Sequence, residues 1–303
     1  MNNNMDSSDV NSQSTVAPRI KLVDSGDGLR NAVREYFNAI KYDTPSKTTE
    51  IEAKFGTGRR QAPGRDGFNV SPPITKLNYD EVIKKLRFEG FVAKATDGVY
   101  RLSFKHDQPQ DRAGDRPWPD VRVEIWGVPA INYYCKTDSL DQTRQKYPSA
   151  VMFTQKTMMR DYSGKPLHVA FESSNFKVSC NTENTKPDRL DQMLGEWDRV
   201  RPKKWFRLIN RVTYTHPKYF VKFDLSITKN ANASADRLVD SGVFGQPERH
   251  ELEIELDNAR VMAGLVSEDV LLAQFKKCIK FVMSGIQSTN YPVSYVEQPS
   301  TPI

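Results

Sequence analysis

Eight short segments of this 303-residue chain alternate apolar and polar residues with a period of two, and no other feature limits its fold as strongly. Successive side chains of a β-strand point to opposite faces, so each segment is predicted to be a strand with one apolar and one polar face. The segments span residues 50–55, 99–104, 121–126, 169–171, 176–180, 206–214, 219–228 and 250–256. So many short strands, separated by Gly, Pro and Asn, predict an antiparallel sheet that closes, in a mainly β protein of the α+β class.

Three further segments have the periodicity of amphipathic helices. They cover residues 27–40, 78–86 and 267–285. Asn78 is the predicted N-cap of the second helix, with Glu81 in the capping-box position, and Gly285 suits the end of the third. The stretches 56–73, 106–119 and 229–247 are rich in Gly, Pro and polar residues and are predicted to be long loops.

Residues 1–18 have no periodicity and almost no large apolar residues, which predicts a disordered tail ahead of a single domain over 19–303. The chain has no apolar run of membrane-spanning length and no signal-peptide pattern, so we expect an intracellular protein with no membrane partner. Its three cysteines are far apart and are expected to be free thiols. The formal net charge of +6 favours an anionic partner such as RNA or polyphosphate.

Two predicted strands at opposite ends of the chain each carry a charged face. Glu50, Glu52 and Lys54 share a face of the first, and Glu251, Glu253 and Glu255 share a face of the second. If both strands belong to one sheet, five carboxylates gather on one face. Like charges roughly 5 Å apart repel by about 3 kcal/mol at an effective dielectric constant of about 20. Such a cluster calls for a divalent cation, and oxygen-only ligands favour Mg²⁺ or Mn²⁺.

The other predicted strands carry cations on their polar faces, among them Arg122, Lys177, Arg211 and Lys222. An ordinary β-sandwich would expose these faces to water, whereas a closed barrel would line a polar tunnel with both signs of charge. Such a tunnel suits a triphosphate, because acidic strands would hold a metal while Lys and Arg neutralise phosphoryl oxygens. The spacing alone does not decide between the two arrangements, and a solvated face on each strand is the alternative.

These segments, in this order, resemble a known family. Residues 50–56 (EIEAKFG) together with 251–255 (ELEIE) resemble the glutamate motifs of the metal-dependent RNA 5′-triphosphatases of fungal and large-DNA-virus mRNA capping, which are triphosphate tunnel metalloenzymes. Residues 176–183 (FKVSCNTE), 211–216 (RVTYTH) and 223–226 (FDLS) are similar to the segments between them. The resemblance covers about 45–290 and implies a closed antiparallel eight-stranded β-barrel, the triphosphate tunnel, with flanking helices.

The resemblance also implies residue roles. Glu50, Glu52, Glu253 and Glu255 would hold Mg²⁺ or Mn²⁺ directly or through water, with Glu251 and Asp224 supporting them. The phosphates would be gripped by Arg122, Lys156, Lys177 and Arg211. Glu183 would orient or deprotonate the attacking water. The implied reaction converts 5′-triphosphate RNA to 5′-diphosphate RNA plus phosphate, the first step of cap formation.

Two positions depart from the family pattern. Ile209 stands where a Lys is usual, and Lys177 stands where Arg is commoner. Residues 286–297 are similar to the junction before a guanylyltransferase domain, yet the chain has no Lys-x-Asp-Gly nucleotidyl motif. A separate guanylyltransferase or other capping-complex subunit is therefore an implied partner. The implied location is the host cytoplasm or virion for a viral enzyme and the nucleus otherwise.

Two other functions fit the same residues. One is a tunnel-fold tripolyphosphatase or nucleoside triphosphatase, and the other is a non-catalytic RNA-binding scaffold of a capping complex. The four histidines have no ligand spacing. The four tryptophans are predicted to be core or rim residues rather than base-stacking platforms, and they are Trp118, Trp126, Trp197 and Trp205.

Overall fold

The computed structural model describes residues 28–60, 68–71, 73–94, 100–107, 120–171, 175–186, 194, 203–264 and 266–289. The side chains at 57–60, 68–71 and 287–289 are outside this description. The predicted disordered tail over 1–18 lies outside the described residues, as does most of the segment 286–297.

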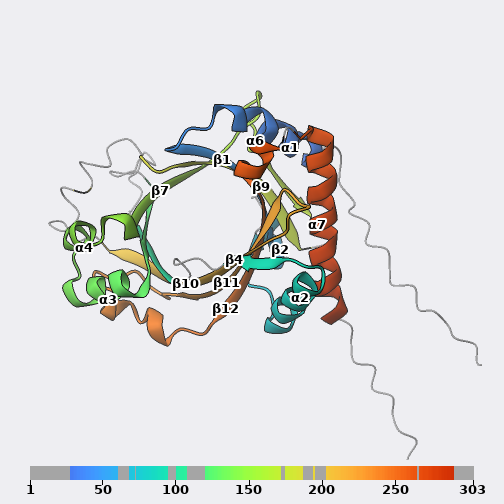
Figure 1. Cartoon of the computed structure of the whole chain (residues 1–303). Helices are drawn as coiled ribbons and strands as arrows, with labels where there is room; N and C mark the ends of the chain where they lie inside the picture. The colour runs from blue at the N-terminus through green and yellow to red at the C-terminus, as the bar shows by residue number, and fades with distance from the viewer. Residues whose placement is uncertain are drawn as a thin grey trace, which may run out of the picture.

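Eight antiparallel strands form a closed β-barrel, seen end-on in Figure 1. In spatial order they are β1 (Lys47–Phe55), β12 (Arg249–Leu256), β11 (Val221–Asn230), β10 (Lys204–Thr215), β5 (Tyr100–His106), β6 (Val121–Trp126), β7 (Val151–Met158) and β9 (Phe176–Asn184). The barrel closes because β9 also pairs with β1 along its whole length. The predicted fold class is confirmed.

Two strands extend the barrel sheet, and two more form a small sheet of their own. β8 (His168–Phe171) pairs with β9, and β4 (Val92–Lys94) pairs with β10. β2 (Thr57–Arg60) pairs with β3 (Phe68–Ser71) inside the stretch 56–73, which was predicted to be a loop. In the predicted loop 229–247, β11 runs on to Asn230 and two short 3₁₀ turns follow, η4 (Val239–Ser241) and η5 (Val243–Gly245).

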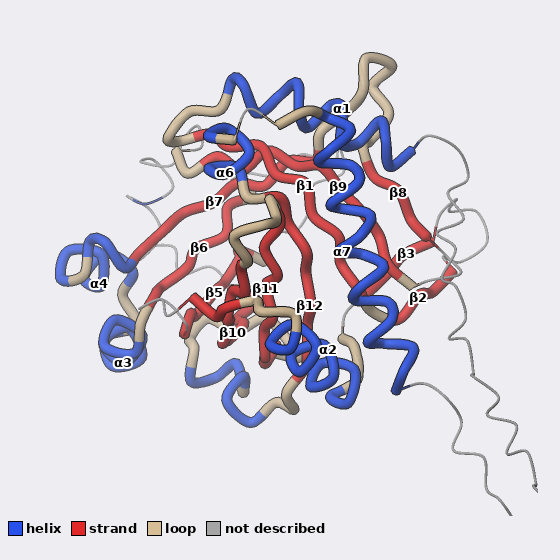
Figure 2. Tube along the Cα trace, turned by 45° about the vertical axis from the view of Figure 1, so that its right-hand side comes forward, coloured by secondary structure: helices blue, strands red, loops and turns tan. Residues whose placement is uncertain are grey.

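The apolar faces of the strands point out of the barrel, where helices cover them. α7 (Glu268–Thr289) crosses one side between α1 (Gly28–Ala39) and α2 (Lys76–Phe88), as Figure 2 shows. α3 (Val128–Thr137) covers β5 and β6 and packs on α4 (Leu140–Lys146), while α6 (Asn258–Ala263) follows β12. Two hydrophobic clusters fill these outer interfaces. The polar faces therefore turn inward. No helix in the described part of the chain is long and apolar enough to cross a membrane.

Two predicted helix boundaries are wrong. α2 begins at Lys76 with Thr75 as its N-cap, because the Thr75 hydroxyl accepts the Asn78 backbone N–H at 3.1 Å and the Asn78 side chain accepts the Thr75 N–H at 3.3 Å. Asn78 is thus the third helical residue. α7 continues past Gly285, where a Cβ would lie 3.0 Å from the Val82 side chain. Gly285 therefore lets α7 approach α2 closely and does not end the helix.

The strand β7 and the helices α3 and α4 were not predicted. β7 buries only Val151 and Phe153, and the polar residues 154–157 follow on both faces, so its alternation is too short to recognise. The predicted segment 169–171 is instead part of β8, which lies outside the closed ring. The number of barrel strands was right, but one member was wrong.

We expect Ile254→Ala to lower the free energy of unfolding by about 2 to 5 kcal/mol, because Ile254 is fully buried on the outer face of β12. Urea unfolding followed by circular dichroism measures this change. Leu77→Ala on α2 is the matched control, since its side chain is 68% exposed, and should cost less than about 0.5 kcal/mol. Equal effects of the two substitutions would contradict an outward-facing core.

Candidate active site within the barrel

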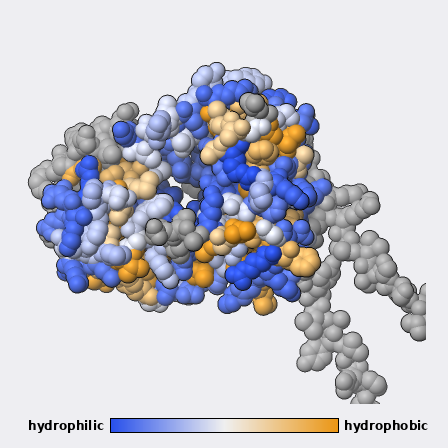
Figure 3. Space-filling view, in the orientation of Figure 1, coloured by the Kyte–Doolittle hydropathy of each residue, from blue (hydrophilic) through white to orange (hydrophobic). Residues whose placement is uncertain are grey.

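The barrel encloses a cavity of about 700 Å³ lined mainly by charged side chains. In Figure 3 the surface is hollowed near its centre, with hydrophilic residues around the opening. Within the described residues, the lining carries nine basic and seven acidic side chains. They are Lys54, Lys94, Arg101, Lys105, Arg122, Lys156, Arg207, Arg211 and Lys222, and Glu50, Glu52, Glu124, Glu183, Asp224, Glu253 and Glu255. The wall therefore mixes both signs of charge with a small excess of cations.

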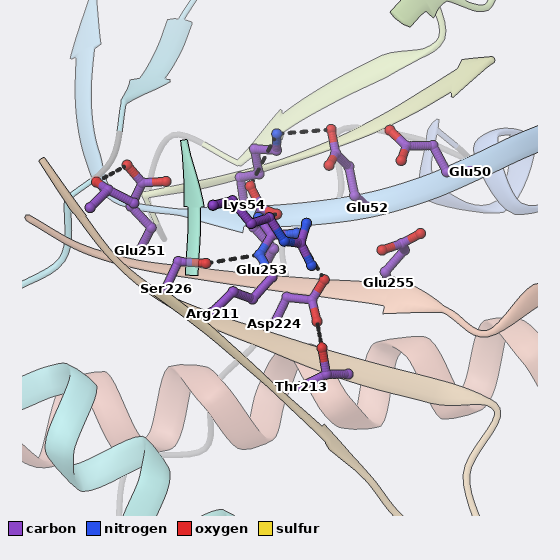
Figure 4. Close-up of polar contacts among 12 residues, drawn as sticks. Glu50, Glu52, Lys54, Arg211, Thr213, Asp224, Ser226, Glu251, Glu253 and Glu255 are labelled. Carbon is purple, nitrogen blue, oxygen red and sulfur yellow. Dashed lines mark hydrogen bonds and ion pairs between the residues drawn. The ribbon is translucent and has the colours of Figure 1, made fainter. Parts of the chain in front are cut away.

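The two glutamate strands, far apart in the sequence, are hydrogen-bonded neighbours in the barrel. Across the β1–β12 pair, Glu52 stands opposite Glu255 and Lys54 opposite Glu253. Figure 4 shows these side chains turned toward one another inside the barrel, with Glu50 next to Glu52 on β1. Four of the five predicted carboxylates, Glu50, Glu52, Glu253 and Glu255, therefore gather on one inner wall.

Basic side chains from other strands reach into this acidic wall. Lys156 of β7 crosses to the carboxylates of Glu50 and Glu52, and its ammonium lies 3.0 Å from Glu52. Lys54 lies 3.1 Å from Glu52 and 3.2 Å from Glu253. Lys54 therefore links carboxylates of β1 and β12, and Lys156 links β7 to the carboxylates of β1.

A second bridge comes from β10. The Arg211 guanidinium lies 3.1 Å from Asp224 on β11 and 3.1 Å from Glu253 on β12. Its Nε also donates to the Ser226 hydroxyl at 2.9 Å. Lys222 pairs with Glu255 at 3.1 Å. Three adjacent strands are therefore linked by alternating charges.

The repulsion among the carboxylates is not fully cancelled by these cations. Burial, with the neighbouring charge of Glu52, raises the pKa of Glu50 to about 8. Burial also raises the pKa of Glu255 to about 7, although Lys222 opposes the change. Burial acts on Glu253 as well, but Lys54 and Arg211 hold its pKa well below the usual range. The inner wall therefore favours additional positive charge beside Glu50 and Glu255.

The donor set has the chemistry of a hard-cation site. Glu50, Glu52, Glu253 and Glu255 offer only carboxylate oxygens, which Mg²⁺ and Mn²⁺ prefer. In the described part of the chain, however, no three acidic, His or Cys side chains converge as a ready ligand group. The ammonium groups of Lys54 and Lys156 and the guanidinium group of Arg211 lie between the carboxylates instead. The residue types fit a divalent ion, and binding it would require these cationic groups to move away from the carboxylates.

The remaining predicted residues divide into two groups. Glu183 lines the cavity opposite Lys156 of β7, and Arg122 lines it 3.8 Å from Glu124. Glu251 does not reach the cavity wall, because it is buried against Arg207 and accepts the Thr228 hydroxyl at 3.0 Å. Lys177 is also absent from the cavity lining.

Lys177 lies across the β1–β9 pair from Lys54. Burial and the Lys54 charge lower the pKa of Lys177. Of the four predicted phosphate ligands, Arg122, Lys156 and Arg211 line the cavity and Lys177 does not.

Arg101 is a tunnel residue that the sequence did not single out. It stands opposite Ile209 across the β5–β10 pair. Ile209 is the position at which the sequence pattern led us to expect a Lys. Its guanidinium lies 3.7 Å from Glu124 and 3.9 Å from the centre of the Trp126 ring. Only its alternation with Leu102 could have indicated that it faces the tunnel.

No protein-family model and no curated protein sequence matches the chain. Among solved structures, the RNA triphosphatase domain of a trifunctional mimivirus mRNA capping enzyme aligns with 85% of this chain and 98% of its own, at 14% identity and a TM-score of 0.48. The S. pombe Pct1 RNA triphosphatase aligns with 90% of this chain and 98% of its own, at 17% identity and a TM-score of 0.43. Pct1 bound to the Spt5 CTD has the same score and identity. Because these values are low, we base the function on this chain's own side chains.

We expect Arg211→Met to lower the free energy of unfolding by about 3 kcal/mol, because Asp224 and Glu253 would lose the guanidinium that bridges them inside the barrel. Lys76→Ala, which breaks the exposed pair with Asp80, should cost less than about 0.5 kcal/mol. Urea unfolding of both variants tests the comparison. An Arg211→Met protein as stable as wild type would contradict the inward placement of this bridge.

Proposed function

We propose that this chain is an RNA 5′-triphosphatase of mRNA capping, which hydrolyses the γ-phosphate of 5′-triphosphate RNA with the help of Mg²⁺ or Mn²⁺. The main support is the pairing of β1 with β12 inside a closed barrel, which faces Glu52 toward Glu255 and Lys54 toward Glu253. A solvated polar face, the alternative left open by the sequence, would not be enclosed. A non-catalytic RNA-binding surface would not need buried carboxylates beside cations.

In the proposed reaction the carboxylates would bind the metal ion, and the basic side chains would bind the phosphates. Glu50, Glu52, Glu253 and Glu255 would hold the divalent ion, which when bound neutralises these carboxylates and polarises a phosphoryl oxygen. Lys54 and Lys156 now pair with the same carboxylates. With a divalent ion neutralising that charge, their ammonium groups would be free to bind the phosphates. Arg211 on β10, which pairs with Glu253, and Arg122 on β6 also line the cavity and would bind the remaining phosphoryl oxygens.

Glu183 would orient the attacking water and accept its proton. It lines the cavity on β9, which pairs with both β1 and β7, and it stands opposite Lys156 without belonging to the β1–β12 cluster. The water oxygen forms a bond to the γ-phosphorus as the bond to the bridging oxygen breaks. The products are 5′-diphosphate RNA and inorganic phosphate. A diphosphate end is what a guanylyltransferase takes, so we propose such a subunit as a partner inside the cell.

The first test measures phosphate release from triphosphate-ended RNA, with ATP and tripolyphosphate in parallel. We expect wild-type protein to release phosphate from RNA with Mg²⁺ or Mn²⁺ and to lose this activity with a chelator. Glu52→Ala and Glu253→Ala should each reduce the rate of phosphate release from RNA by more than about 100-fold. Loss of a residue that only hydrogen-bonds to a metal ligand typically costs roughly 10- to 100-fold. Glu89→Ala, an exposed glutamate after α2, is the control. Full activity in Glu52→Ala would refute the metal assignment, and hydrolysis of tripolyphosphate but not RNA would indicate the other tunnel activity.

The second test detects the ion without turnover. Mn²⁺ at about 100 times its Kd should stabilise the wild-type fold by about 2.7 kcal/mol and raise its Tm accordingly. The double variant Glu52→Gln and Glu253→Gln keeps the side-chain volumes but removes two charged donors, so its Tm should not respond. Differential scanning fluorimetry with and without Mn²⁺ measures both. An equal rise in the two proteins would place the ion elsewhere.

A further inference from the structure

The charged tunnel contains a half-exposed tryptophan, Trp205. Trp205 lies on the inward face of β10 and lines the cavity, yet 45% of its surface is exposed. Its neighbours Lys204 and Phe206 are buried on the outer face, as the alternation of the strand requires. A half-exposed ring at a polar cavity gains only part of the free energy of transfer from water. Its exposed surface is accessible to a molecule that enters the cavity.

The cations beside this ring form one row across three strands. Trp205 stands opposite Lys105 on β5, and Lys105 stands opposite Arg122 on β6. All three side chains line the cavity. They belong to the barrel end where β6 and β10 begin and β5 ends. Arg207, two residues along β10, faces the same way. An indole next to a row of cations is the arrangement that binds single-stranded nucleic acid, through base stacking and phosphate contacts.

The Trp205 indole is oriented by a hydrogen bond at its N–H edge, and the described residues leave its two ring faces uncovered. The Trp205 indole N–H donates to the Asp107 carboxylate, which also accepts the Ser234 hydroxyl. These hydrogen bonds lower the pKa of Asp107, with the bond from Ser234 the stronger cause. Among the described residues, no ring or cation packs on a face of Trp205. Trp126 differs, because the Arg101 guanidinium covers its ring at 3.9 Å. Trp205 is therefore the tunnel tryptophan whose orientation is fixed while its π-surface stays open.

We propose that Trp205 is the platform on which a nucleobase of triphosphate-ended RNA stacks, with Lys105 and Arg122 contacting the phosphates next to it. This proposal rests on the proposed function and deepens it. Every tunnel group described for the reaction binds phosphates alone and would treat tripolyphosphate and RNA alike. The indole adds a contact that only a substrate with a base can make. Because every base has a π-face, this contact selects RNA over free polyphosphate without selecting a particular sequence.

The kinetic test compares kcat/KM for triphosphate-ended RNA with kcat/KM for tripolyphosphate. In Trp205→Leu, which keeps an apolar side chain but removes the ring, the ratio of the two should fall about 5- to 150-fold, mainly through KM for RNA. Trp205→Phe should restore most of the ratio, since a phenyl ring still stacks. Tyr162→Ala, which removes a fully exposed aromatic outside the tunnel, should leave it unchanged. An unchanged ratio in Trp205→Leu, or no rescue by Trp205→Phe, would overturn the proposal.

A binding test separates this proposal from the reaction itself. A 5′-diphosphate RNA oligonucleotide should quench the tryptophan fluorescence of the wild-type protein, and most of that quenching should disappear in Trp205→Phe. If the wild type hydrolyses no triphosphate-ended RNA but RNA still quenches its fluorescence more than that of Trp205→Phe, base stacking on Trp205 is supported and the proposed reaction is refuted. If hydrolysis occurs but quenching is equal in both proteins, the platform fails and the reaction stands. Circular dichroism of each variant confirms that it is folded.

Discussion

The pairing of β1 with both β12 and β9 is the constraint on which the rest of this structure depends. It closes the sheet, leaves no exposed edge on the barrel strands and fixes which residues of the two glutamate strands stand opposite each other. Because α1, α2 and α7 cover the outside of these strands, the charged faces have only the interior to occupy. The enclosed cavity is thus a consequence of hydrophobic packing on the outer surface.

Enclosing so many charges is costly, and the barrel reduces the cost by alternating their signs between strands. Lys54 and Lys156 contact carboxylates of β1 and β12, while Arg211 links β11 to β12. Buried ion pairs of this kind add little net stability, because desolvation offsets much of the attraction. Under the proposed function, the cations that now compensate the carboxylates would bind the triphosphate once a divalent ion took their place.

Period-two alternation predicted which residues of a strand share a face, and this was enough for β1, β6, β11 and β12. It could not predict the sheet order, because that order depends on contacts between segments up to two hundred residues apart. β7 was missed since only Val151 and Phe153 mark its apolar face. Glu251 and Lys177 share faces with tunnel residues, yet neither lines the cavity, and Glu251 is instead buried against Arg207 and Thr228. Facing inward is therefore necessary but not sufficient to reach the site.

Cross-strand register also decides where the cations of the tunnel stand. Ile209 carries no charge on β10, but its partner Arg101 on β5 places a cation on the adjoining strand. Arg101 also covers the Trp126 ring, whereas among the described residues no cation packs on Trp205 near the opposite end of the barrel. The residue type and the alternation of the strands do not distinguish these two tryptophans. Their different neighbours across the strands leave the Trp126 ring in contact with a protein cation and the Trp205 ring exposed, as base stacking under our proposal requires.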